Sequence, residues 1–375
     1  MILTLAMRNL FHDRIRLVVT LVGILFSIVL VAVQLGLYVG ASRMIVAMID
    51  KANGDLWITA YGAKSFEDSG FLEGQERYAA LSTPGVRRVV PLIASFSKWN
   101  KPQGGSQLCV IVGTDVADGG LEPWNVVAGD VAALKLPDAV ALDRTYLDFF
   151  GIKGMGATAE VQNQRVRVTA MTHGIRSFTT MPYIFTTLDR ARKLFGVSSE
   201  AATFFLVQLD KGADIATVQK ELKRRLPDVE VLTKSELKGR SIEQWLFGTG
   251  AGVALIGGAL LGLLVGTVIV AQTLYSSTKD HLNEFATLRA LGSSSGYIHK
   301  VILAQAGLSA VLGYVLGMAI AMVIIAYSLN TALPIIMTWG LAAGLFALTL
   351  AICAISAIGA IVKVMKIDPA MVFNR

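Results

Sequence analysis

Three long stretches of the chain are strongly apolar and carry no charged side chain. They cover residues 17–42, 244–278 and 301–362. A helix that crosses the hydrocarbon core of a bilayer needs about 20 apolar residues, so the first two stretches each hold one span. The third is long enough for two, and the break at Asn330–Pro334 divides it. We therefore predict four transmembrane helices, over residues 17–42, 244–275, 301–328 and 336–362.

The first span could be mistaken for a cleaved secretion signal, because basic residues precede it. Its apolar core is longer than the 7–15 residues usual for such a signal, which favours an uncleaved signal-anchor.

Residues 43–243 have the pattern of a mixed α/β domain with helical stalk ends. Strands are predicted at 55–60, 87–94, 107–112, 203–209 and 229–232, with a hairpin limb at 160–169. Asp214 is the expected N-cap of a helix that continues to Leu226. We expect one lobe from residues 44–100 plus 200–240, and an insertion lobe from residues 101–200. Trp245 is expected at the membrane interface, where aromatic side chains gather.

The basic residues near the ends of the spans predict the orientation in the membrane, because cytoplasmic loops carry an excess of Lys and Arg. They cluster in the segments 1–16, 276–300 and 363–375. These segments are therefore expected in the cytoplasm, which places both termini there and residues 43–243 outside.

Composition supports this assignment and narrows the chemistry. Only 16% of the 375 residues are charged, against about 25% in soluble domains. The net charge of +7 can serve as a topology signal, so no nucleic-acid partner is implied. The two cysteines, Cys109 and Cys353, lie in different segments and are not expected to pair.

Catalytic and cofactor motifs are absent from the sequence. It has no GxxxxGK[ST] phosphate-binding loop, no HExxH and no GxSxG, which are the signatures of nucleotide binding, metalloproteases and serine hydrolases. Spans two to four hold no acid, Lys, Arg or His, whereas ion-coupled transporters usually need such a residue at depth. We expect a non-catalytic chain with no cofactor or metal of its own.

Small residues recur at every fourth position of the second span. The ladder consists of Gly250, Ala254, Gly258, Gly262 and Gly266. Such stripes let helix backbones approach closely in lipid. The ladder is equally compatible with packing inside one subunit and with a dimer interface.

The segment between spans two and three holds a short amphipathic helix. Leu282, Phe285, Leu288 and Leu291 form its apolar stripe. Glu284 suits the helix N-terminus, and Gly292 is a ready terminator. The helix could lie on the bilayer surface, or it could insert into a soluble partner.

The sequence Glu284–Gly292, EFATLRALG, resembles the coupling helix of the FtsX/MacB-type ABC permease superfamily. The tail Lys366–Arg375 is similar to the closing D-P-A-x-x-x-x-R pattern of that family. The first span, with RLVVTLVGILFS and VQLGLY, looks most like the DevC branch. The resemblance implies ATPase-coupling roles for Leu282, Glu284, Phe285, Leu288, Arg289, Leu291 and Gly292. It also implies an amphipathic cytoplasmic elbow helix over residues 1–16.

The resemblance further implies a mechanism and a set of partners. A DevA-like ATPase would bind ATP and Mg, a DevB-like membrane-fusion adaptor would join, and two copies of this chain would form a homodimer in the bacterial inner membrane. ATP-driven movement of the periplasmic domain would then export or extract a lipid, glycolipid or other amphiphile. Two alternatives stay open: a lipoprotein-releasing or FtsX-like regulatory permease that acts on periplasmic proteins, and a membrane enzyme.

Overall fold

The computed structural model describes residues 2–115, 119–280, 287, 294–329, 331 and 333–365. The chain divides into two compact units. We call residues 1–40 with 253–375 the helical unit, and residues 41–252 the sheet unit. The predicted fold class, four apolar helices with a mixed α/β domain between the first and the second, is confirmed.

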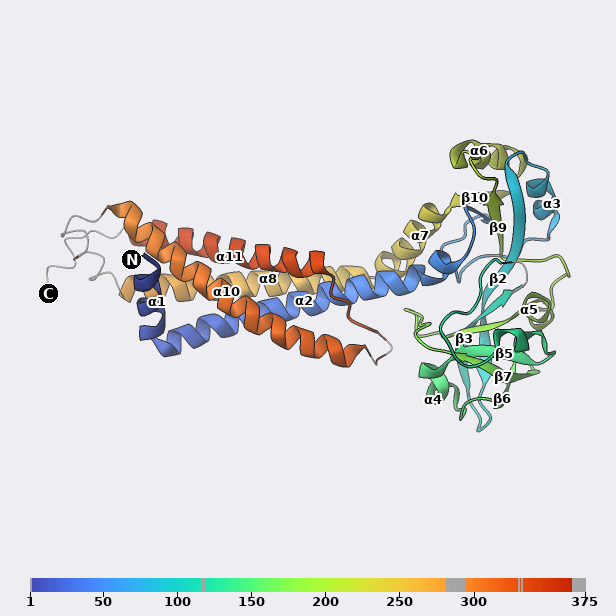
Figure 1. Cartoon of the computed structure of the whole chain (residues 1–375), viewed down its shortest axis with the longest axis horizontal. Coiled ribbons are helices and arrows are strands. Elements are labelled where there is room, and N and C mark those ends of the chain that lie inside the picture. Colours follow the sequence, from blue (N-terminus) through green and yellow to red (C-terminus); the bar gives the residue numbers. More distant parts are fainter. Residues whose placement is uncertain are drawn as a thin grey trace. The chain divides into compact units, whose positions relative to one another are not determined.

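Among the described residues, the helical unit has five helices, and the four long ones run beside one another in Figure 1. They are α1 (Ile2–His12), α2 (Arg14–Lys51), α8 (Ala251–Asp280), α10 (Ser295–Ser328) and α11 (Trp339–Met365). All except α1 are long and apolar enough to cross a membrane. Side chains of α2, α8, α10 and α11 share one buried cluster, which includes Ile24, Val270, Ala306 and Cys353.

Helix ends differ from the predicted boundaries in two places. The expected elbow helix over residues 1–16 ends at His12, and Arg14 and Arg16 already belong to α2. The second span was expected from residue 244, but α8 begins only at Ala251. In both places a short non-helical stretch lies between two helices, although the apolar pattern of the sequence shows no break there.

The connection between α10 and α11 lies against two glycines of α2. The Ile336 N–H donates a hydrogen bond to the Gly36 carbonyl over 3.0 Å. A Cβ added at Gly40 would lie 2.1 Å from the Pro334 carbonyl oxygen. Because only hydrogen occupies that space at glycine, the chain of the connection can contact the helix backbone directly.

Ten strands form the single mixed sheet of the sheet unit. They are β1 (Leu56–Ala60), β2 (Val86–Asn100), β3 (Ser106–Thr114), β4 (Val126–Gly129), β5 (Ala139–Asp143), β6 (Thr158–Val161), β7 (Gln164–Thr172), β8 (Tyr183–Thr187), β9 (Phe204–Leu209) and β10 (Val229–Thr233). Their order is β10-β1-β9-β2-β3-β8-β5-β7-β4, and β6 pairs with β2 and β7. Only β3–β8 and β5–β7 are parallel pairs.

The helices of the sheet unit are short. They are α3 (Gln75–Leu81), α4 (Leu147–Phe150), α5 (Leu188–Phe195), α6 (Ile215–Arg225) and α7 (Lys234–Ile242), with the 3₁₀ segments η2 (Val131–Lys135) and η3 (Arg144–Tyr146) and the π-helical η4 (Glu243–Gly248). As predicted, Asp214 caps α6: its carboxylate accepts the Thr217 N–H over 2.9 Å.

The predicted division into two lobes, with a boundary after residue 100, coincides with the end of β2. That strand belongs to both halves of the sheet, because its first part pairs with β9 as far as Leu92 and its second part pairs with β3 from Ile93 onward. The described residues 41–252 belong to one compact unit, so the two lobes stay a prediction. One buried cluster includes Val110, Phe185 and Phe204, so the two halves share a core.

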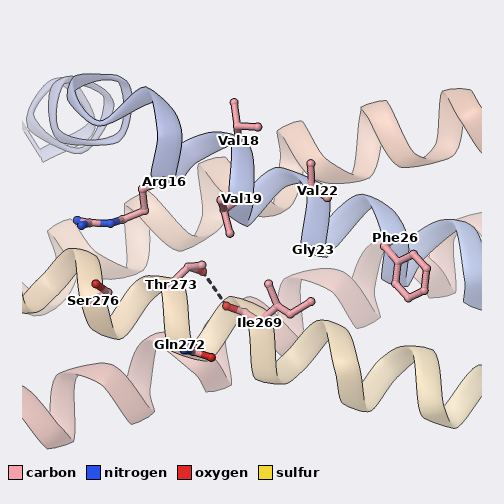
Figure 2. A pocket seen from close by; sticks show the side chains of 10 residues that line it. All are labelled: Arg16, Val18, Val19, Val22, Gly23, Phe26, Ile269, Gln272, Thr273 and Ser276. Carbon is pink, nitrogen blue, oxygen red and sulfur yellow. Dashed lines mark hydrogen bonds between the residues drawn. The ribbon is translucent and has the colours of Figure 1, made fainter.

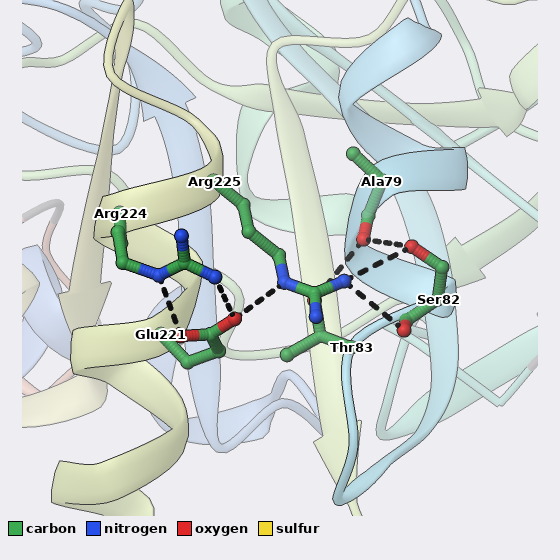
Figure 3. A network of polar contacts seen from close by, with 6 residues as sticks. All are labelled: Ala79, Ser82, Thr83, Glu221, Arg224 and Arg225. Carbon is green, nitrogen blue, oxygen red and sulfur yellow. Dashed lines mark hydrogen bonds and ion pairs between the residues drawn. The ribbon is translucent and has the colours of Figure 1, made fainter.

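Helix α6 is fastened to the end of α3 by the polar network that Figure 3 shows. Glu221 pairs with Arg224 at 2.7 Å and with Arg225 at 2.6 Å, and the two guanidinium groups lower its pKa to about 2. Arg225 also donates to the Ser82 carbonyl over 3.2 Å. Exposed ion pairs contribute little stability, so this network mainly orients α6.

We predict that Gly40→Ala destabilises the helical unit, because the new methyl group would displace the backbone at Pro334. Overpacking of this kind costs about 1–3 kcal/mol. The melting temperature of the purified permease in nanodiscs measures the effect. Gly359→Ala in α11 is the matched control, since nothing lies within 4 Å of its added Cβ. Equal melting temperatures for both variants would contradict the docking of the connection on α2.

Candidate functional site

The predicted ATPase-coupling residues lie outside the described residues. They are Leu282, Glu284, Phe285, Leu288, Arg289, Leu291 and Gly292. The structure does describe the helices on either side, because α8 ends at Asp280 and α10 begins at Ser295. The predicted coupling segment, which lies between Asp280 and Ser295, therefore joins α8 to α10. The contacts of these two helices determine which parts of the chain would move if a partner displaced the segment.

The glycine ladder of the second span is shorter than predicted. Gly250 precedes α8 and has a φ of 78°, a left-handed conformation that glycine adopts without strain. Ala254 is the first ladder position inside the helix, and it is exposed. The helical stripe therefore excludes Gly250, because the chain turns there before the helix starts.

The other three ladder positions face α2 of the same chain. A Cβ added at Gly258 would lie 2.6 Å from the Gln34 amide nitrogen, and one at Gly262 would lie 2.9 Å from Leu30 Cδ2. At Gly266 the nearest atoms belong to Ser27, at 2.4 Å. These glycines thus serve close packing of α8 on α2, whereas a role of the ladder in dimerisation stays a prediction.

A hydrogen bond between α2 and α8, and a glycine on α2 itself, strengthen this packing. The buried hydroxyl of Ser27 donates to the Gly262 carbonyl over 2.9 Å. Gly23 on α2 leaves room for Ile269 of α8, whose Cγ2 would lie 2.3 Å from an added Cβ. In lipid, where apolar exposure is not penalised, such close packing and interhelical hydrogen bonds hold helices together.

Helix α10 also packs on α2 through glycines, at other positions of α2. An added Cβ at Gly313 would lie 2.4 Å from Ile24 Cγ2, and one at Gly317 would lie 3.1 Å from Ile28 Cβ. The two helices that flank the coupling segment therefore both pack on α2 through glycines. Displacement of either one has to be accommodated by α2.

An open cleft of about 670 Å³ lies between α2 and α8 near the start of α2. Figure 2 shows Val18, Val22 and Phe26 from α2 together with Ile269 and Gln272 from α8 along this cleft. The three α2 side chains are 50–57% exposed. The cleft therefore exposes an apolar surface that α2 and α8 leave uncovered.

Arg16 links the two helices at the end of this cleft. Its guanidinium pairs with Asp280, the last residue of α8, and with Asp13 at 3.3 Å. Asp280 is 54% exposed, so the pair contributes about 0–1 kcal/mol. It nevertheless connects the start of α2 with the helix end that leads into the coupling segment.

A buried carboxylate joins η4 to the sheet in the other unit. Glu67 accepts hydrogen bonds from the Trp245 indole at 3.0 Å, from the Ser65 hydroxyl at 3.0 Å and from the Tyr183 hydroxyl. Burial, and then the nearby Glu67 charge, raise the pKa of Tyr183 well above its usual value. Trp245 was expected at the membrane interface, but its indole nitrogen is bonded inside the sheet unit. Neither Glu67 nor Tyr183 carries a sequence signal that reveals this cluster.

Two family descriptions match the chain and together cover most of it. The MacB-like periplasmic core domain matches residues 17–225, more than half of the chain. The FtsX-like permease C-terminal domain matches residues 256–369. The chain is an ABC transporter permease of the MacB/FtsX type. This confirms the superfamily predicted from EFATLRALG and the tail, and such permeases are generally non-catalytic partners of an ATPase.

Individual relatives of this permease are distant. An uncharacterised ABC transporter permease of Methanocaldococcus jannaschii is 25% identical over 176 residues, which cover 45% of this chain and 43% of the relative. The match therefore spans less than half of that protein.

Solved structures show similarity over the sheet unit. The periplasmic region of MacB from Actinobacillus actinomycetemcomitans has 12% identity and a TM-score of 0.37, covering 51% of this chain and 94% of that one. The extracellular domain of the noncanonic ABC-type transporter YknZ from Gram-positive bacteria has 13% identity and a TM-score of 0.35, covering 48% and 99%.

We predict that Gly262→Leu and Gly266→Leu lower the melting temperature of the permease even in dilute detergent, because the bulk separates α8 from α2. The matched control is Gly257→Leu on the same helix, where an added Cβ meets nothing within 4 Å. Crosslinking between differently tagged copies measures self-association in parallel. If the two variants lost crosslinking while their melting temperatures stayed unchanged, the glycines would serve dimerisation and not packing in one chain.

Proposed function

We propose that this permease transmits ATP-driven movement from a separate ATPase subunit to its sheet unit, and that the movement exports or extracts a lipid, glycolipid or other amphiphile. The observation that carries the proposal is the common packing of α8 and α10 on α2. The coupling segment joins α8 to α10, so an ATPase that moved this segment would act on both helices at once. Their glycine contacts would pass the displacement to α2.

Helix α2 provides a continuous path out of the helical unit. It runs unbroken from Arg14 to Lys51, and the unit boundary falls within it after Gly40. Strand β1 starts five residues after its end, at Leu56. A shift or rotation of α2 along its axis would therefore reach the sheet unit through regular helix, without a flexible linker to absorb it.

The orientation that this function needs follows from the basic residues. Arg14, Arg16 and Lys279 flank the ends of α2 and α8 that adjoin the coupling segment. On this basis we propose that the segment lies in the cytoplasm beside the ATPase, which would hold ATP and Mg, and that the sheet unit lies in the periplasm. We also propose that two copies associate in the membrane, as the resemblance to this family implies.

The resemblance of the first span to the DevC branch supports a third component. In that branch the permease works with a DevA-like ATPase and a DevB-like membrane-fusion adaptor, and we propose the same assembly here. An adaptor suits an amphiphilic cargo, which must be shielded from water after it leaves the membrane.

Variants of the coupling segment test the proposal. Glu284→Lys, Phe285→Ala and Leu288→Ala should reduce capture of the cognate ATPase, because interface anchors of this kind are worth about 2–4 kcal/mol. Pull-down of that ATPase and its hydrolysis rate in nanodiscs are the measurements. Leu261→Ala is the matched control, since this leucine is 64% exposed on α8, away from the segment.

The pattern across the three variants separates coupling from simple membrane contact. On a bilayer surface, Glu284→Lys would be neutral or favourable, because a cation suits anionic headgroups. Wild-type capture and hydrolysis in all three variants would rule out the segment as the coupling element.

Cysteine labelling tests the orientation. The native Cys109 is buried, and burial raises its pKa to about 12, so an impermeant maleimide should leave it unlabelled near neutral pH. The exposed position in Ser106→Cys should react in intact spheroplasts, whereas Ser294→Cys should react only after permeabilisation. Labelling of Ser294→Cys in intact spheroplasts would invert the proposed topology.

A further inference from the structure

The sheet unit contains a second cleft, of about 660 Å³, whose wall is dominated by cations. It lies among α3, η2 and α5, and it is separate from the cleft between the apolar helices. The basic side chains that line it are Arg77, Lys135, Arg190, Arg192 and Lys193, and the acidic ones are Asp115 and Asp189. Five cations therefore share one cleft with two carboxylates.

Among the described residues, most of the positive charge in this cleft lacks a close carboxylate partner. Arg190 donates to the carbonyls of Pro137 and Arg165, at 2.7 and 2.6 Å, and these are neutral acceptors. Among the described residues no ion pair to Lys135 or Lys193 is found. The pair between Arg77 and Glu200 is long, at 4.0 Å.

Arg192 shows how strongly the cations are crowded. It is 8% exposed, its Nε donates to the Ala201 carbonyl over 2.9 Å, and its Nη1 lies 3.4 Å from Asp189. Burial lowers the pKa of this guanidinium, whereas Asp189 and Glu200 act to raise it, and the neighbouring Arg77 charge lowers it by the smallest amount. An anion in the cleft would relieve the two lowering effects, because it would replace lost hydration by a direct charge pair.

The topology also favours a ligand at this position. Strands β3 and β8 are parallel neighbours, and they end side by side at Thr114 and Thr187, which both line the cleft. Ligands of α/β sheets bind beyond the carboxyl ends of parallel strands. Helix α5 begins there with Thr187 as its N-cap, so the positive end of its dipole adds to the side-chain charges.

We propose that this cleft binds a phosphate ester, either as a soluble phosphate compound or as the phosphate group of a lipid. Guanidinium groups match phosphate oxygens with paired hydrogen bonds, and lysines add further charge. A dianionic phosphate neutralises more of the excess charge than one carboxylate could. The inference stands on the sheet unit alone, so it holds whether or not the proposed coupling to an ATPase is correct.

Direct binding tests the site. The probes are sn-glycerol 3-phosphate and the short-chain lipid dihexanoyl phosphatidic acid, titrated by calorimetry into the full permease in phosphatidylcholine nanodiscs at constant ionic strength. Both should bind, and dihexanoyl phosphatidylcholine should not. Tighter binding of the phosphatidic acid identifies a lipid as the source of the phosphate, and equal binding identifies a soluble ester.

The double variant Lys135→Gln/Lys193→Gln locates the site. Both lysines are exposed and unpaired among the described residues, so the fold should survive and the affinity should fall roughly tenfold, which corresponds to about 1.4 kcal/mol. Lys211→Gln/Lys220→Gln removes the same charge from exposed positions of the same unit and should bind as wild type.

Three results would overturn the proposal. The first is no binding of either phosphate probe, and the second is an equal loss of affinity in the two double variants. The third is a preference for a polyglutamate peptide over both phosphates, which would make the cleft a docking surface for an acidic protein segment.

Discussion

Close contact between α2 and the glycines of its neighbours is the constraint on which the helical unit depends. In lipid there is little gain from burying apolar side chains, so helices associate where their backbones can approach. Gly262 and Gly266 bring α8 to α2, Gly313 and Gly317 bring α10, and Gly40 admits the α10–α11 connection. A larger residue at Gly40, Gly262, Gly266 or Gly313 would come within 3 Å of atoms of the facing segment, so these contacts require glycine.

With this arrangement, α2 is the helix that the helical unit and the sheet unit have in common. The helical unit and the sheet unit are joined twice along the chain, once within α2 after Gly40 and once after Gly252, in the first turn of α8. The first junction is regular helix, while Gly250, just before the start of α8, has a left-handed conformation. Glu67 then fixes Trp245 of η4 to the sheet, on the side of Gly250 that belongs to the sheet unit.

The sequence predicted elements best where periodicity or a cap is local. The apolar spans, the Asp214 cap and strands such as β1 and β9 were placed to within a few residues. Strands β4, β5 and β8 were missed, because short strands of four or five residues carry no clear alternating pattern. Three other features depend on contacts between segments that are distant in the sequence. They are the helix against which a glycine stripe packs, the pairing of β2 with both β9 and β3, and the Glu67 cluster. A local sequence pattern carries no information about such contacts.

The distribution of charge explains why the two candidate sites differ in character. Spans two to four hold no Asp, Glu, Lys, Arg or His, whereas ion-coupled pathways usually need such a residue at depth. Arginines and lysines gather instead in the sheet unit, around a cleft at the carboxyl ends of β3 and β8. There, water can hydrate the cations when the cleft is empty, so the cost of holding them together stays tolerable. The two roles that we propose, recognition of a phosphate group and transmission of movement, would thus lie in separate units, and α2 is the helix shared by both.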